Sequence, residues 1–192
     1  HPSEGLAERR PAGGRFTRRE GIKVCIVGDV LHSRDARSNI WGLIKMGAEV
    51  GVCGPRSLLP NAIDDFGVTV FDHVEDAIQW ADALNILRLQ LERMQKGYIP
   101  SLREYNRVFG VSRERLARAP RDVLILHPGP MNRGVENDPD VADGPHSVIL
   151  TQANTGGRVR TAGLYLTADG TPEVAAAAKG GGGADRRVHA CA

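Results

Sequence analysis

VLILHPGPMNRGVE, at residues 123–136, joins an apolar run to a turn rich in proline and glycine. The first four residues have the character of a buried strand in a parallel sheet. The prolines and glycines that follow can continue neither a strand nor a helix, so the chain turns sharply at the carboxyl end of that strand. In open α/β sheets, ligands bind beyond this edge. The stretch therefore predicts a rigid loop at a binding edge, with a purely structural turn as the alternative interpretation.

Upstream of that loop, apolar runs of strand length alternate with segments of helical periodicity. Strands are predicted at residues 22–27, 49–53, 68–70, 83–87 and 123–126, and helices near residues 36–46, 61–66, 74–81, 101–105, 112–117 and 138–142. In helix 36–46, the side chains of Ile40, Trp41, Leu43 and Ile44 are predicted to face the core. Strands that alternate with helices predict an α/β fold. We expect a doubly wound, mostly parallel five-stranded sheet with helices on both faces, Rossmann-like in form.

The chain divides into four segments by composition. Residues 1–20 are polar and are interrupted by Pro11 and two adjacent glycines, so weak order is expected there. Residues 21–146 carry the alternating pattern of the main domain. Residues 147–167 predict a carboxyl-terminal helix that is weakened in its middle by two glycines. Residues 168–192, rich in alanine, glycine and basic residues, predict a disordered tail.

The bulk composition excludes several classes of protein. Lys and Arg number 25 against 23 Asp and Glu, a net charge of +2, which predicts no nucleic-acid partner. No apolar run approaches the roughly 20 residues that span a bilayer, so no membrane partner is expected. The three isolated cysteines (Cys25, Cys53 and Cys191) predict a reducing compartment, here the cytoplasm. The sequence lacks a dinucleotide fingerprint, a phosphate-binding lysine loop and a zinc motif, which disfavours those three kinds of site.

Two arginines stand at positions where an anion could bind. Arg34 falls at the predicted start of a helix, beside unpaired backbone N–H groups, and Arg88 ends the fourth strand with Gln90 two residues later. Guanidinium groups bind carboxylates in a bidentate way, so two of them at one edge suit a small dianion such as a dicarboxylate. The alternatives are a solvated surface arginine at position 34, and hydrogen-bonded loop histidines rather than catalysts at His32 and His127.

Five motifs together resemble the aspartate carbamoyltransferase catalytic chain. They are GIKVCIVGDVLHSRDARSN, LNILRLQLERM, SLREY, ILHPGPMNRGVE and DVADGPHSVILTQ, in family order between about residues 21 and 166. The resemblance covers the second, aspartate-binding domain of that family. The related ornithine enzymes carry a cysteine in the late loop, whereas Pro128 follows His127 here, which favours the aspartate branch.

The resemblance implies roles for five residues. Arg34 matches the arginine that grips the aspartate carboxylates, and Arg88 with Gln90 matches the pair that recognises the side-chain carboxylate. Pro128 and Gly129 match the loop whose backbone touches the carbamoyl group and the attacking amine. The family transfers the carbamoyl group of carbamoyl phosphate to the α-amino group of L-aspartate and releases phosphate, in pyrimidine synthesis. Neither a metal nor a cofactor takes part.

Other features depart from the family pattern. Its first domain, which cradles carbamoyl phosphate, is absent from the sequence, so residues 1–20 are interpreted as a remnant of it. His1 and Glu4 match a carbamoyl-phosphate motif in which glutamine normally stands at the position of Glu4. Asn137 stands where the family usually has an apolar residue. The family assembles as a homotrimer, and this chain alone holds no complete catalytic set, so on its own it is predicted to be inactive.

Two other functions stay open at this point. A degraded homologue could act as a non-catalytic scaffold, an interpretation that Glu4 favours and that intact Arg34 and Arg88 oppose. An ornithine carbamoyltransferase would need an acidic partner for a cationic side chain near the strand that ends at Arg88, and the sequence indicates none.

Overall fold

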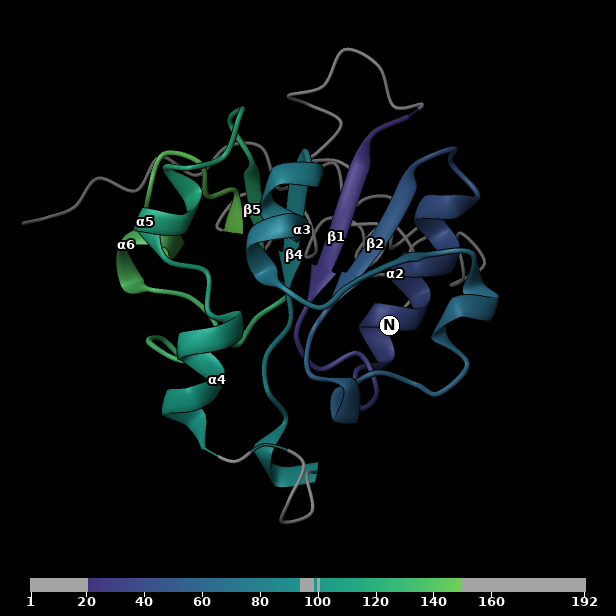
Figure 1. Ribbon diagram of the computed structural model, residues 1–192, viewed down its shortest axis with the longest axis horizontal. Helices are drawn as coiled ribbons and strands as arrows, with labels where there is room; N and C mark the ends of the chain where they lie inside the picture. Colours follow the sequence, from purple (N-terminus) through teal and green to yellow (C-terminus); the bar gives the residue numbers. More distant parts are fainter. Residues whose placement is uncertain (1–20, 94–98, 100, 150–192) are drawn as a thin grey trace, which may run out of the picture.

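The computed structural model describes residues 21–93, 99 and 101–149, and these contain one five-stranded sheet. Its strands are β1 (Lys23–Val27), β2 (Glu49–Cys53), β3 (Thr69–Phe71), β4 (Ala83–Ile86) and β5 (Leu124–Leu126). They pair in the order β3-β2-β1-β4-β5, and every pairing is parallel. All five strands therefore end at the same edge of the sheet, and Figure 1 shows the arrows of β1, β2 and β4 pointing the same way. The predicted α/β fold is confirmed, and each strand lies within two residues of its predicted bounds.

The helices follow the predicted pattern with small changes. They are α2 (Arg34–Ile44), α3 (Val74–Trp80), α4 (Leu102–Phe109), α5 (Arg113–Leu116) and α6 (Pro139–Ala142), with 3-10 turns η1 (Arg56–Leu58), η2 (Ile63–Phe66) and η3 (Leu91–Arg93). Serine caps define three of these helices: the Ser33 hydroxyl accepts the Ala36 N–H, and Ser101 and Ser112 cap α4 and α5 in the same way. The segment near residue 63 is a 3-10 turn rather than an α-helix.

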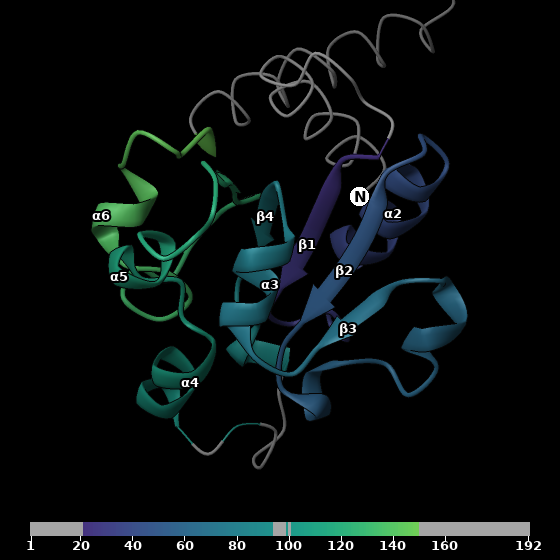
Figure 2. The same ribbon diagram turned by 45° about the horizontal axis from the view of Figure 1, so that its top comes forward.

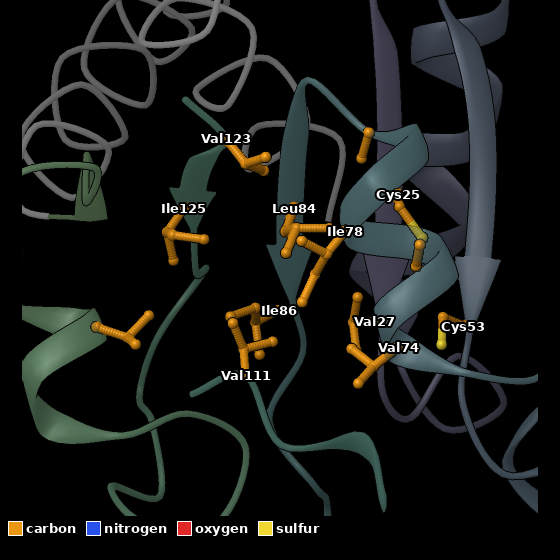
Figure 3. Packing of buried hydrophobic residues seen from close by; sticks show 13 residues of the cluster. Cys25, Val27, Cys53, Val74, Ile78, Leu84, Ile86, Val111, Val123 and Ile125 are labelled. Carbon is orange, nitrogen blue, oxygen red and sulfur yellow. The ribbon is translucent and has the colours of Figure 1, made fainter. Parts of the chain in front are cut away.

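One face of the sheet packs against α3. Alternate strand residues point to this face, and Figure 3 shows Cys25 and Val27 of β1 beside Leu84 and Ile86 of β4, with Ile78 of α3 against them. These five side chains are at most 1% exposed, which removes their apolar surface from water almost completely. The described residues include two cysteines, Cys25 and Cys53, and both are free and buried.

The opposite face packs against α2. Ile26 and Val52 point to this side and contact Ile40 of the helix, so the sheet is covered on two faces as predicted. Figure 2 separates α3, in front of the strands, from α2 behind them. The prediction for Trp41 was wrong: its side chain is 58% exposed, because it lies at the margin of the apolar stripe and meets Phe66 only edge-on.

Three predictions fall outside the described residues. They concern weak order in residues 1–20, a helix that continues beyond residue 149, and disorder in residues 168–192. Within the described part of the chain, every helix is too short or too polar to cross a bilayer.

Candidate functional site

Three neighbouring strands deliver the predicted site residues to one edge of the sheet. β1 pairs with β4, and β4 pairs with β5, all in parallel. The loop after β1 leads to Arg34, the segment after β4 holds Arg88 and Gln90, and the loop after β5 holds Pro128 and Gly129. The structure therefore brings all five predicted aspartate-binding residues to the carboxyl ends of adjacent strands, where parallel sheets bind ligands.

Arg34 is the first residue of α2, as the sequence predicted. Its side chain is exposed, while Ser33 before it is buried and accepts the Ala36 N–H at 3.2 Å. The first turn of an α-helix carries a partial positive charge from backbone N–H groups without intrahelical acceptors. The guanidinium adds a full positive charge at that point, so this corner of the sheet attracts anions.

Asp29 ties the loop after β1 to the segment after β4. Its carboxylate is fully buried and accepts hydrogen bonds from the backbone N–H of His32 at 3.0 Å and from its Nδ1 at 2.9 Å. The second carboxylate oxygen accepts the backbone N–H of Gln90 at 3.4 Å. Arg93 also donates to the backbone oxygen of His32, at 3.2 Å. These contacts hold the loop that leads to Arg34 against the segment that carries Gln90.

Arg88 forms an ion pair with Glu92, one helical turn later. Two carboxylates, those of Glu92 and Asp29, lie near this strand end, where the sequence indicated no acidic partner for a cationic ligand. Each carboxylate is already engaged within the protein, Glu92 by Arg88 and Asp29 by His32 and a backbone N–H. The pair with Glu92 orients the half-buried guanidinium at the edge of the sheet.

Glu136 joins the segment after β4 to the loop after β5. Its carboxylate, on a residue only 1% exposed, accepts the backbone N–H of Leu89 at 2.8 Å. It also accepts hydrogen bonds from the side-chain Nδ2 of Asn132 at 2.7 Å and from the backbone N–H of Asn132 at 2.9 Å. Burial raises the pKa of Glu136, and these hydrogen bonds oppose the rise. Because Leu89 lies between Arg88 and Gln90, the carboxylate fixes the backbone that presents both side chains.

The loop after β5 makes a hydrogen bond to a buried histidine, His127. The backbone N–H of Gly129 donates to Nδ1 of His127 at 2.9 Å, and Gly129 itself has φ +63°, a conformation that favours glycine. His127 is 2% exposed, and burial, followed by the charge of Arg88, lowers its pKa to about 4. The interpretation of His127 as a hydrogen-bonded loop histidine is confirmed.

Sequence reasoning missed the residues that hold the site together. Asp29 and Glu136 are buried carboxylates that accept backbone N–H groups far away in sequence. Asn132 is partly buried, and its side-chain Nδ2 donates to the distant backbone oxygen of Leu89. The available signal was weak: an aspartate directly after a strand, and a glutamate in a loop rich in glycine. Neither spacing predicts which backbone N–H the carboxylate accepts.

Other site predictions are not tested by the described residues. His1 and Glu4, assigned to the carbamoyl-phosphate side, lie outside them. Among residues 21–93, 99 and 101–149, no group of three or more His, Cys, Asp or Glu side chains could hold a metal ion. The absence of a metal in the reaction therefore stays a prediction.

Comparison with known families agrees with this geometry. Residues 20–167 match the family model described as aspartate/ornithine carbamoyltransferase, Asp/Orn binding domain. This match identifies the described domain as the Asp/Orn-binding domain of a carbamoyltransferase. The chain belongs to the aspartate/ornithine carbamoyltransferase family.

Two curated relatives with high sequence identity are both named aspartate carbamoyltransferase catalytic subunits. The chain is 71% identical over 181 residues to the aspartate carbamoyltransferase catalytic subunit of Gemmatimonas aurantiaca, covering 94% of this chain and 57% of that protein. It is 54% identical over 171 residues to the catalytic subunit of the same name from Heliobacterium modesticaldum, covering 89% and 55%. The chain thus spans a little more than half the length of these relatives.

Solved structures share the fold. The ornithine carbamoyltransferase of Pyrococcus furiosus superposes with a TM-score of 0.71 at 24% identity, over 86% of this chain and 56% of that one. The aspartate transcarbamoylase of Trypanosoma cruzi, in complex with N-(phosphonacetyl)-L-aspartic acid, gives 0.70 at 21% identity, over 83% and 53%. At these identities the likeness supports the α/β fold alone.

Proposed function

We propose that this chain supplies the aspartate half of an aspartate carbamoyltransferase site. The reaction transfers the carbamoyl group of carbamoyl phosphate to the α-amino group of L-aspartate and gives N-carbamoyl-L-aspartate and phosphate, a step of pyrimidine biosynthesis. The observation that carries the proposal is the position of Arg34, Arg88 and Gln90 in the segments that follow the adjacent parallel strands β1 and β4, which the carboxylate of Asp29 joins. The names of the curated relatives support the same activity.

Each side chain has a role that suits the charge of aspartate. Arg88 and Gln90 bind the side-chain carboxylate, and Arg34 shares in holding the two carboxylates, because guanidinium groups make bidentate, charge-assisted hydrogen bonds. The carbonyl groups of Pro128 and Gly129 accept hydrogen bonds from the amine and the carbamoyl group. Catalysis rests on positioning the amine against the carbamoyl carbon and on stabilising the charge that develops there.

The carbamoyl-phosphate half of the site is assigned to parts other than the described domain. The relatives are almost twice as long as the matched region, which is consistent with a separate phosphate-binding part. We propose that the working enzyme is a homotrimer in the cytoplasm, and that this chain alone is inactive. The two free, buried cysteines fit a reducing compartment.

Ornithine is a poorer fit to the same edge. Its side chain carries a positive charge, which the guanidinium groups of Arg34 and Arg88 would repel. The nearby carboxylates of Asp29 and Glu92 are engaged by protein groups, so neither is left to pair with the ammonium group of ornithine. The charges at the edge therefore favour aspartate, and the same intact arginines argue against a scaffold without activity.

A chimeric enzyme tests the proposal. In it, this chain replaces the matching part of the Gemmatimonas aurantiaca catalytic subunit, and carbamoyl aspartate is measured against the concentration of L-aspartate. Arg88→Ala should lower kcat/KM for aspartate about 100-fold, the loss expected for a charge-assisted hydrogen-bond pair, with the KM for carbamoyl phosphate unchanged.

Arg121→Ala is the matched control. Arg121 also forms an ion pair, with Asp82 at 3.0 Å, but it precedes β5 and lies at the opposite edge of the sheet. Its kinetic constants should equal those of the parent chimera. A parent chimera without activity, one that prefers L-ornithine, or full activity of the Arg88 variant would contradict the proposed function.

A further inference from the structure

The loop after β5 offers a ligand no backbone hydrogen-bond donor over three consecutive residues. Pro128 and Pro130 have no N–H group. The only N–H between them belongs to Gly129, and it donates to Nδ1 of His127 at 2.9 Å. The carbonyl groups of the same residues are acceptors. Whatever binds against this part of the loop meets acceptors alone.

The side chain that removes the last donor is fixed in place. His127 follows the buried strand β5 directly and is itself 2% exposed. A ring nitrogen that accepts an N–H is unprotonated, so a neutral imidazole must carry its proton on Nε2. Burial and the positive charge of Arg88 both oppose protonation of the ring, and the pKa of His127 is lowered to about 4. The ring therefore keeps its acceptor at neutral pH.

We propose that His127 is a positioning residue: its Nδ1 holds the Gly129 N–H, so that residues 128–130 accept hydrogen bonds from a ligand N–H group and discriminate against an anion. The assignment rests on the proposed function, in which the groups that reach this loop are the amine of aspartate and the NH2 of the carbamoyl group. The carboxylates belong at Arg34 and Arg88. Loss of the imidazole acceptor would free the Gly129 N–H as a donor in the part of the loop where the amine must bind.

Two substitutions separate this role from mere packing. In His127→Asn, the side-chain oxygen occupies nearly the position of Nδ1 and can accept the same N–H. In His127→Gln, the amide reaches instead the position of Nε2, and the Gly129 N–H loses its acceptor. His146→Asn is the control, because His146 is partly exposed and lies 3.8 Å from Asp122, away from the loop.

The hydrogen bond can be observed directly in the 192-residue chain. With uniform 15N labelling, we expect a scalar coupling across the hydrogen bond between the Gly129 amide nitrogen and Nδ1 of His127, with the proton on Nε2. The amide of Gly129 should exchange faster in the Gln variant and stay protected in the Asn variant. A protonated Nδ1, or equal exchange in both variants, would overturn the assignment.

Kinetics in the chimera then test the effect on ligands. His127→Gln should lower kcat about tenfold, the loss of one hydrogen bond at the reacting amine, with the KM for L-aspartate within about threefold of the parent. Its preference for L-aspartate over succinate, which lacks the amine, should fall by a similar factor. His127→Asn and His146→Asn should keep both quantities within about threefold of the parent.

Titration of active sites with N-(phosphonacetyl)-L-aspartate corrects these constants for any unfolded fraction. If the Gln and Asn variants then show the same kcat and the same preference over succinate, His127 has a packing role only and the proposal fails. If the parent chimera is inactive, the proposed function fails, while the coupling in the 192-residue chain still decides whether His127 holds the loop.

Discussion

The apolar side chains inside the sheet and the carboxylates at its carboxyl edge are equally buried, but different forces hold them. Ile26, Val52 and Leu84 fill the interior with apolar side chains that are 0% exposed. At the edge, Asp29 and Glu136 are at most 1% exposed, yet each is a carboxylate that accepts backbone N–H groups. Burial thus stabilises the interior without directional bonds, whereas the edge depends on particular donor and acceptor pairs.

The difference shows how the fold can be stable and the site still be precise. An apolar core tolerates changes of shape that preserve its volume, since its contacts are non-directional. A buried carboxylate fixes each loop that it bonds, and its removal leaves every one of its donors without an acceptor. Mutations at the edge should therefore cost more, atom for atom, than mutations in the interior.

Glu136→Leu should produce the largest loss of stability. It leaves the backbone N–H groups of Leu89 and Asn132 without an acceptor and the Asn132 amide with only its 3.4 Å bond to the Leu89 oxygen, so the free energy of unfolding should fall by about 3–5 kcal/mol. Ile26→Val in the interior should cost only about 0.5–1.5 kcal/mol. Urea denaturation of both variants measures the two losses in the free energy of unfolding. A smaller loss for Glu136→Leu than for Ile26→Val would contradict the claim that the edge is more sensitive to mutation than the interior.

Acid should lower the free energy of unfolding through protonation of His127. Its pKa is about 4 in the fold and about 6.5 in the unfolded chain, so between these values the unfolded state binds the extra proton. The free energy of unfolding should thus fall by about 3 kcal/mol as the pH drops from 7 to 4. Glu136 acts in the opposite direction, because its raised pKa makes the folded state bind protons more readily.

The contribution of His127 is isolated by the Asn variant. The difference in unfolding free energy between the parent chain and His127→Asn should change with pH between about 4 and 6.5 and be flat above that window. Chemical denaturation at each pH gives both curves. Parallel curves across the whole range would show that the imidazole is not held neutral by burial.

Two glycines with positive φ differ in the space around them, one in a crowded turn and one in an open turn. Gly28 directly follows β1 and has φ +119°, and an added Cβ would lie 3.0 Å from the backbone oxygen of Leu87. Gly67 has φ +69° and no atom within 4 Å of an added Cβ. Gly28→Ala should cost about 2–3 kcal/mol and Gly67→Ala about 1 kcal/mol, measured by thermal unfolding. Equal losses would mean that crowding at the edge adds nothing.

The smallest effect should be a gain. Asn137 is fully buried, and neither polar atom of its side chain has a hydrogen-bond partner among the described residues. Asn137→Leu removes that uncompensated amide and restores the apolar character that the family resemblance predicts, so stability should rise by about 1 kcal/mol. A loss of stability on denaturation would show that the amide makes a contact that the volume of leucine cannot replace.

The sequence was sufficient for the fold because the fold is governed by local periodicity. Apolar runs such as residues 49–53 and 123–126 identified the strands, and serine caps such as Ser101 marked helix starts. The error at Trp41 has a physical cause: periodicity places residue 41 next to the buried stripe, and only the packed structure shows on which side of its margin the ring falls.

The site was predictable only in part. Arg34, Arg88 and Gln90 could be placed because strand ends in a parallel sheet share one edge. The bond from Glu136 to the backbone of Leu89 spans 47 positions, and no local pattern encodes it. Sequence therefore indicates which side chains reach the edge, and tertiary structure shows which groups hold them there.

The most direct test of the central claim is a crystal structure of the chimera with N-(phosphonacetyl)-L-aspartate, in which the distances from the ligand carboxylates to the two guanidinium groups are measured. We expect Arg34 and Arg88 each to lie within about 3 Å of a carboxylate oxygen, with the Gly129 N–H still bonded to His127. A ligand whose carboxylates contact neither arginine would contradict the account.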